Sequence, residues 1–249
     1  MKKEEIETFI KRYNLGNLIP KVKWKYNSSS KTLHTRGVAD QNDSFVVDVI
    51  MHDFTDLGDS DVTLCIGDTE KVIGMMTPFV GEDITLSLNK NEEKVMGLTM
   101  SDADCESYCT MADAAAISAV PKNINLLIDF QVEVPITEDF IDKFLKAKAA
   151  LKEVMFFSIG MNQKNVFEVV LGHTTINSNR IRLTPTTDPI KNSIDTALSF
   201  PIKNIAEVLK ANSDIEGGLM SINKNGIIRL FFSNEKYTCT YYQFAVKKM

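Results

Sequence analysis

The segment Ile6-Glu7-Thr8-Phe9-Ile10-Lys11 has a close counterpart 135 residues further along the chain, Ile141-Asp142-Lys143-Phe144-Leu145-Lys146. In both copies the apolar side chains recur at the spacing of one face of a helix, and charged side chains occupy the opposite face. Each copy therefore predicts a short amphipathic helix. One such match could arise by chance, because apolar pairs at helical spacing are common.

Three further matches keep nearly the same offset. They comprise a helical pattern, a polar turn and a strand: Val72, Ile73, Met75 and Met76 with Ile205, Ala206, Val208 and Leu209; Asn89-Lys90-Asn91 with Asn223-Lys224-Asn225; Tyr108 and Ala112 with Tyr241 and Ala245. A nearly constant offset across helix, turn and strand indicates an internal duplication. The sequence predicts an α+β fold with two similar domains, each with two helices packed on antiparallel sheet.

The predicted division places an N-terminal domain at 1–113, a connector at 114–135 and a C-terminal domain at 136–249. Within the connector, a small-residue stretch (Ala114-Ala115-Ala116) is followed by Pro121, the apolar Leu126-Leu127-Ile128 and Pro135. Helix starts are expected at Asp68 and Thr137, because both residue types cap helices well.

Length and composition are those of a folded protein. The chain has 249 residues, a net charge of −5 and 44% hydrophobic residues. No apolar run reaches the ~18–20 residues that span a bilayer, and the opening residues turn acidic where a signal peptide would turn apolar. We therefore expect no membrane association and a cytoplasmic location. The acidic balance argues against coating nucleic acid by bulk charge, so any contact with DNA would use a local patch.

Strong catalytic signatures are absent from the sequence, including phosphate-binding loops, zinc-protease motifs and nucleophile elbows. The acidic stretch that contains Asp53, Asp56, Asp59 and Asp61 lacks the glutamate at the twelfth position of a calcium loop, so a solvated turn is expected. Cys105 and Cys109 have the wrong spacing for a zinc site. We predict no cofactor and no metal, and a protein that is not an enzyme.

Every predicted helix carries basic residues on or beside its exposed face. These residues are Lys11, Arg12, Lys71, Lys143, Lys146, Lys203 and Lys210. Two interpretations remain open at this point. The basic faces could contact DNA, or lysine could be present only because it is a good helix former.

The duplicated helix-and-sheet pattern, the basic helix faces and the acidic total together resemble the sliding clamps, the DNA polymerase processivity factors of phage and eukaryotic replication. The most recognisable segments are 37–50, the predicted helix at 68–79 and the ending Tyr241-Tyr242-Gln243-Phe244-Ala245-Val246. The resemblance implies a homotrimeric ring that encircles duplex DNA, tethers the replicative DNA polymerase and is placed on DNA by an ATP-dependent clamp loader. The seven basic residues above would then face the DNA, and the location would be the host cytoplasm if the source is viral.

In that family, partner proteins insert a hydrophobic peptide into a pocket beside the connector and the C-terminal segment. By this resemblance the pocket residues are Val38, Phe45, Val47, Leu126, Ile128, Tyr242 and Val246. Each of them also has an alternative interpretation as a core residue. The resemblance further implies that subunits join through edge strands, which we expect at 107–113 and 180–184.

Two other functions stay open from the sequence. One is an α+β enzyme with a dispersed acidic metal site, similar to a nuclease. The other is a β-rich virion or scaffold protein that never meets DNA.

Overall fold

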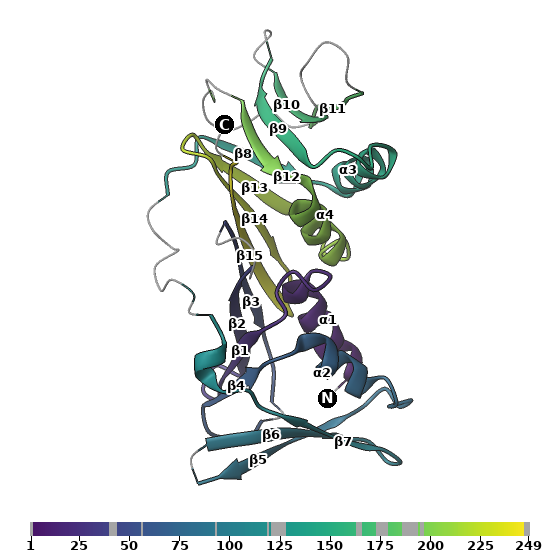
Figure 1. The fold of residues 1–249 in the computed structure, drawn as a ribbon, viewed down its shortest axis with the longest axis vertical. Coiled ribbons are helices and arrows are strands. Elements are labelled where there is room, and N and C mark those ends of the chain that lie inside the picture. The colour runs from purple at the N-terminus through teal and green to yellow at the C-terminus, as the bar shows by residue number, and fades with distance from the viewer. Residues whose placement is uncertain are drawn as a thin grey trace. The chain divides into compact units, whose positions relative to one another are not determined.

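The computed structural model describes residues 2–39, 44–55, 57–92, 94–118, 120, 128–162, 166–172, 179–185, 194 and 197–246. The chain forms two compact units (Figure 1). The first unit contains Met1–Pro121 together with Glu235–Cys239, and the second contains Lys122–Asn234 together with Thr240–Met249. None of the helices in the described part of the chain is both long and apolar enough to cross a membrane.

The first unit has two helices, a four-stranded sheet and a three-stranded sheet within its described residues. In chain order its elements are α1 (Lys3–Asn14), β1 (Val22–Asn27), β2 (Thr32–Val38), β3 (Phe45–Met51), β4 (Val62–Ile66), α2 (Thr69–Met76), β5 (Thr85–Asn91), β6 (Lys94–Ser101) and β7 (Glu106–Thr110). The strands follow the orders β4-β1-β2-β3 and β5-β6-β7, and all the pairs are antiparallel. A short 3₁₀ turn, η1 (Ala114–Ala116), follows β7.

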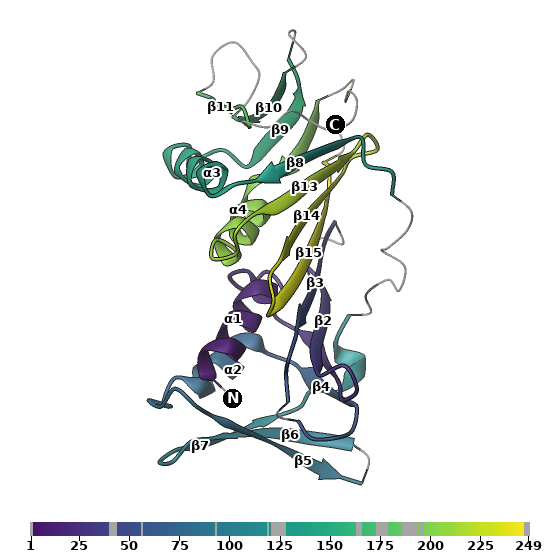
Figure 2. The same ribbon diagram turned by 180° about the vertical axis from the view of Figure 1, so that it is seen from behind.

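The second unit repeats this arrangement after one additional strand. Its elements are β8 (Val132–Ile136), α3 (Glu138–Ala150), β9 (Phe156–Met161), β10 (Phe167–Leu171), β11 (Ile181–Leu183), β12 (Leu198–Pro201), α4 (Ile202–Ala211), β13 (Gly218–Asn223), β14 (Ile227–Ser233) and β15 (Tyr237–Phe244), whose first three residues belong to the first unit. The strand orders are β11-β10-β9-β12 and β15-β14-β13-β8. Figure 2 shows α3 and α4 side by side from behind.

The topology confirms the predicted duplication. In each unit a helix precedes four strands whose order in the sheet is fourth, first, second, third, and a second helix then leads into a three-stranded meander. The correspondence extends to one backbone pairing just before the first helix of each unit. In the first unit Lys2 forms an isolated β-bridge with Asp83, and at the equivalent place in the second unit Ile136 of β8 pairs with Gly218 of β13. The predicted α+β fold with two similar domains, each with two helices packed on antiparallel sheet, is therefore observed.

An aromatic cluster attaches α1 to the sheet of the first unit. The Phe9 ring lies 5.5 Å from the Tyr13 ring and 5.7 Å from the Trp24 ring, and the alternation of buried and exposed side chains along β1 directs Trp24 to this side. The Trp24 indole donates a hydrogen bond to the Tyr13 hydroxyl. Burial raises the pKa of that hydroxyl well above its usual value, so it stays protonated.

The second unit has an equivalent cluster around Phe144, the counterpart of Phe9. The Phe144 ring lies 6.0 Å from Phe140 and 5.4 Å from Phe157, and Phe157 in turn lies 5.8 Å from Phe200. The expected caps are also present, because Thr137 accepts a hydrogen bond from the Phe140 amide and Asp68 accepts one from the Lys71 amide.

The end of the predicted connector forms a strand that the sequence did not predict. Residues 132–136 make up β8, and its side chains alternate between buried and partly exposed positions. The proline at 135 suggested a loop, but β8 lies at the edge of its sheet, where a missing amide donor is tolerated. The middle of the connector, including Leu126, lies outside the described residues.

The two segments expected at sheet edges do lie there. β7 is the last strand of its three-stranded sheet, and β11 is the outer strand beside β10. Within the described part of the chain, each therefore presents one row of backbone amide and carbonyl groups without a strand partner inside its own sheet.

We predict that Phe9→Ala and Phe144→Ala each lower the free energy of unfolding by about 3–5 kcal/mol, because both remove a fully buried ring from a packed cluster. Urea denaturation followed by tryptophan fluorescence and by circular dichroism measures the change. Val80→Ala is the control, since Val80 is 97% exposed and its truncation should stay within about 0.5 kcal/mol. A neutral result for either phenylalanine would contradict the equivalence of the two clusters.

Candidate nucleic-acid interface

The C-terminal halves of α3 and α4 border an open groove of about 400 Å³ in the second unit. Its lining combines three lysines, Lys148, Lys152 and Lys210, with one carboxylate, Glu207, and with small or apolar side chains between them. Of the lysines, the sequence predicted only Lys210. The i, i+4 spacing of Lys148 and Lys152 was the signal that could have identified the other two.

Charge is unevenly distributed along the helices. In α3, Glu138 and Asp139 occupy the first turn and Lys148 the last. In α1, the first turn carries Glu4 and Glu5. Acidic residues at the N-terminus and basic residues at the C-terminus complement the helix dipole, so part of this pattern has a purely structural cause. The two ends of α3 therefore carry side-chain charges of opposite sign, and the positively charged C-terminal end borders the groove.

Lys143 and Lys146 are exposed, and each contacts an acidic residue one turn earlier. Lys143 lies 2.7 Å from Asp139, and Lys146 lies 2.8 Å from Asp142. All four side chains are more than half exposed, so these ion pairs add little to stability. The pairs lower the local positive charge of α3 relative to the sequence expectation.

Of the other predicted basic residues, Lys11, Lys71 and Lys203 are exposed on α1, α2 and α4. Arg12 is different, and its predicted DNA-facing role is wrong for this structure. Its side chain is fully buried, with the guanidinium carbon 4.6 Å from the centre of the Tyr237 ring. The reason is that the last turn of α1 packs on the start of β15, 225 residues away in the sequence.

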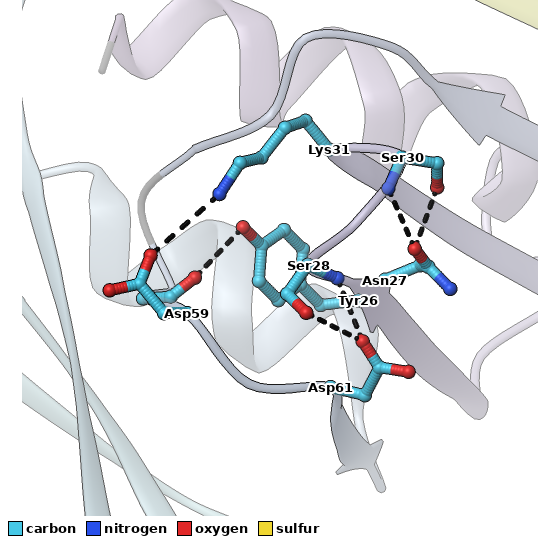
Figure 3. A network of polar contacts seen from close by, with 8 residues as sticks. Tyr26, Asn27, Ser28, Ser30, Lys31, Asp59 and Asp61 are labelled. Atoms are coloured by element: carbon cyan, nitrogen blue, oxygen red, sulfur yellow. Dashed lines mark hydrogen bonds and ion pairs between the residues drawn. The ribbon is translucent and has the colours of Figure 1, made fainter.

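The acidic stretch at 53–61 lies in the connection from β3 to β4 and contacts the turn of the β1–β2 hairpin (Figure 3). Asp61 accepts hydrogen bonds from both the amide and the hydroxyl of Ser28, and these bonds lower the pKa of its carboxyl group. Asp59 lies 3.9 Å from Lys31. Asp56 lies outside the described residues. Across the part of the chain that the structure describes, no three His, Cys, Asp or Glu side chains gather as a metal site would require.

Comparison with known proteins finds no matching family model and no matching curated protein. Solved structures do match over nearly the whole chain. Proliferating Cellular Nuclear Antigen (PCNA) from Entamoeba histolytica is 14% identical with a TM-score of 0.70, and the match covers 98% of this chain and 96% of that one. This chain has the sliding-clamp fold.

Two further clamp structures give the same result. A structure of the C-terminal region of FEN-1 bound to A. fulgidus PCNA matches with 17% identity and a TM-score of 0.74, covering 100% of this chain and 98% of that one. The PCNA2–PCNA3 complex from Sulfolobus tokodaii matches with 13% identity and a TM-score of 0.70, with coverage of 100% and 98%. At these identities the likeness concerns the fold.

Within this clamp fold, two of the predicted peptide-pocket residues are core residues. Phe45 and Val47 are 0% exposed and lie on the β3 face that packs against α1. A Cβ atom added at Gly37 would lie 3.4 Å from Val47, which places this side chain in a tightly packed layer. No peptide could reach either residue in this conformation, so for both of them the core interpretation holds.

The remaining pocket candidates are distributed over both units. Val38 and Ile128 are half-buried, Tyr242 is 7% exposed and Val246 is 39% exposed, and Leu126 lies outside the described residues. The sequence missed Phe244, which is 41% exposed. Tyr241 accepts a hydrogen bond from Asn212, which follows α4, and Gln243 accepts one from Asn204 on α4. Because side chains alternate along a strand, those of Tyr242 and Phe244 lie on the opposite face of β15.

We predict that Arg12→Ala acts on the stability of the clamp fold and not on an exposed surface. Loss of a buried guanidinium and its ring contact should lower the free energy of unfolding by about 2 kcal/mol or more. Lys11→Ala, one residue earlier and exposed, should change it by less than about 0.5 kcal/mol. Urea titrations of both variants test this, and equal effects would mean that Arg12 lies in solvent.

Proposed function

We propose that this protein is a sliding clamp, a homotrimeric ring that encircles duplex DNA and tethers the replicative DNA polymerase to confer processivity. The observation that carries the proposal is the likeness to PCNA structures across 98–100% of the chain, including the internal duplication. In this role the protein has no catalytic step of its own. Its contribution is topological retention on DNA, and it works in the cytoplasm, that of the host if the source is viral.

Exposed helix lysines would supply the contacts with DNA. Five of them are exposed at separate positions on the helices: Lys11, Lys71, Lys143, Lys146 and Lys203. The lysines of the α3–α4 groove, Lys148, Lys152 and Lys210, form a group. Contacts to phosphates are independent of sequence and weaken with salt. Because the ring itself retains the DNA, weak contacts are an advantage: they centre the duplex without preventing sliding.

Ring closure would join β7 of one subunit to β11 of the next. Tyr108 on β7 is 46% exposed, and its ring lies across Gly97, where a Cβ atom would come within 2.4 Å of it. Beside β11 lies a hollow of about 320 Å³ lined by residues that include Phe140 and Leu183. An exposed aromatic residue on one edge and, at the other, a hollow lined by both apolar and charged side chains are complementary features for a heterologous interface that closes into a ring.

Partner proteins would include the DNA polymerase and an ATP-dependent clamp loader. The matched A. fulgidus PCNA is bound to the C-terminal region of FEN-1, which supports recognition of short partner segments here as well. In this chain the exposed apolar side chains of the C-terminal segment, Phe244 and Val246, are suited to such contacts. Val38, Ile128 and Tyr242 stay candidates for the same role.

The topological claim can be tested on circular DNA. The clamp is loaded onto a nicked plasmid with the loader and ATP from the same source, and the complex is isolated by gel filtration. A single restriction cut should release the protein, because a ring slides off a free end. Retention on the linear product would identify an ordinary DNA-binding protein, and degradation of the plasmid with divalent metal alone would favour the nuclease alternative.

The groove lysines provide a second prediction. Lys148→Ala, Lys152→Ala and Lys210→Ala together should reduce retention on the nicked circle and lower the slope of its logarithm against log salt by at least about 1. The matched control replaces three exposed lysines of the hairpins, Lys90, Lys94 and Lys224, so that the net charge is identical. Equal losses in both triple variants would show that only total charge matters.

A third prediction concerns ring closure. Tyr108→Ala should convert the trimer, with three times the chain mass of 27.9 kDa, into monomers, because it removes the largest exposed side chain of β7. Light scattering coupled to gel filtration measures the mass. Phe244→Ala is the control, since it removes an aromatic side chain of similar exposure from another strand and should leave the trimer intact. A Tyr108→Ala trimer would place the subunit contact elsewhere.

A further inference from the structure

The sheet β4-β1-β2-β3 of the first unit has a second face, which points away from α1 and α2 and which we call the open face; the short η1 turn lies on the same side (Figures 1 and 2). α1 packs on the opposite face, through Phe9 against Trp24 and through its contacts with β3. Because side chains alternate along a strand, residues such as Lys23 and Lys25, between the buried Val22, Trp24 and Tyr26, belong to the open face. Of the residues predicted from the sequence to bind a partner peptide, Val38 lies on this face, whereas the charged residues of the face were not part of that prediction.

Positive charges lie next to one another across β1 and β2 on this face. Lys23 is directly opposite Arg36, and Lys25 is directly opposite His34. Like charges in directly opposed positions, here those of Lys23 and Arg36, destabilise a sheet. The arrangement is also unexpected in a chain with a net charge of −5. A sheet face built this way is energetically better when a negative partner covers it.

One carboxylate compensates part of this charge. Asp48 on β3 lies 2.6 Å from Arg36 and 2.8 Å from His34, and it is the sole acidic side chain that these four strands, all within the described residues, direct to this face. With His34 neutral, three cations against one anion leave a charge of +2. Lys23 and Lys25 are the cations farthest from Asp48, which contacts only β2 side chains in these pairs.

The surroundings of the charges favour a peptide over a nucleic-acid backbone. Half-buried apolar side chains, Val38 on β2 and Ile50 on β3, lie on the same face as the cations. Side chains two residues apart on an extended segment are separated by about 6.6–6.8 Å, the same spacing as Lys23 and Lys25.

We propose that this open face of the first unit, defined by Lys23, Lys25, His34 and Arg36, binds an extended acidic peptide segment of a partner protein, with carboxylates at alternate positions pairing with Lys23 and Lys25. The interaction is independent of whether the helices contact DNA. Two acidic residues near the hairpin end of β1 have other partners and do not compete for these lysines. Asp59 pairs with Lys31, and Asp61 accepts hydrogen bonds from Ser28 (Figure 3).

The test uses the full-length protein and a fluorescein-labelled twelve-residue peptide in which Glu alternates with Thr and Val. Fluorescence anisotropy gives the dissociation constant. Lys23→Gln with Lys25→Gln should weaken binding by about fivefold or more, the effect of losing two exposed ion pairs. The matched control, Lys90→Gln with Lys94→Gln, alters two exposed lysines of another sheet and should change binding by less than about twofold.

Three results would overturn the proposal: no saturable binding of the peptide, equal losses in both double variants, or preferential binding of a labelled oligothymidylate that Lys23→Gln with Lys25→Gln abolishes. Thermal unfolding of each variant confirms that the fold is intact. The plasmid release experiment is run on the same variants. Normal release with lost peptide binding supports both proposals, whereas failed release with normal peptide binding in the unaltered protein would remove only the clamp function.

Discussion

The attachment of one helix to one face of a sheet through an aromatic cluster is the contact on which the rest of each unit depends. In the first unit Phe9, Tyr13 and Trp24 make it, and in the second unit Phe144 and Phe157 do. Burying these rings orients the helix, and the helix orientation then decides which of its side chains face water. The exposed lysines of α1 and α3 are therefore a consequence of the packing beneath them.

The same packing separates the chemistry of the two sheet faces. Apolar residues of β1 and β3 contact the helices, and polar or charged residues occupy the alternate positions. The open face of the first unit thereby gains Lys23 and Lys25, and the surface of the second unit near the end of β15 gains Phe244. One repeated architecture therefore presents different surfaces in its two copies, because the duplicated positions have kept their core residues while the exposed positions differ.

Edge strands introduce a further constraint. β7 and β11 end their sheets, and an uncovered edge favours pairing with another chain. An assembly that pairs the two edges would satisfy those backbone groups and cover Tyr108 at the same time. This makes the proposed ring more than a means of holding DNA, since it also removes a surface that would otherwise promote aggregation.

The sequence by itself determined the duplication and the helix starts at Asp68 and Thr137, and the resemblance to the sliding clamps indicated the two edge strands. The helix starts depend on cap residues and local periodicity, which are visible within a few residues of the chain, and the duplication depends on matched patterns at a nearly constant offset along it. Only the tertiary structure decided the burial of Arg12 against Tyr237, the groove that brings Lys210 to Lys148 and Lys152, the core positions of Phe45 and Val47, and the pairing of β8 despite Pro135. Each of these depends on contacts between residues far apart in the sequence, whose partners no local pattern identifies.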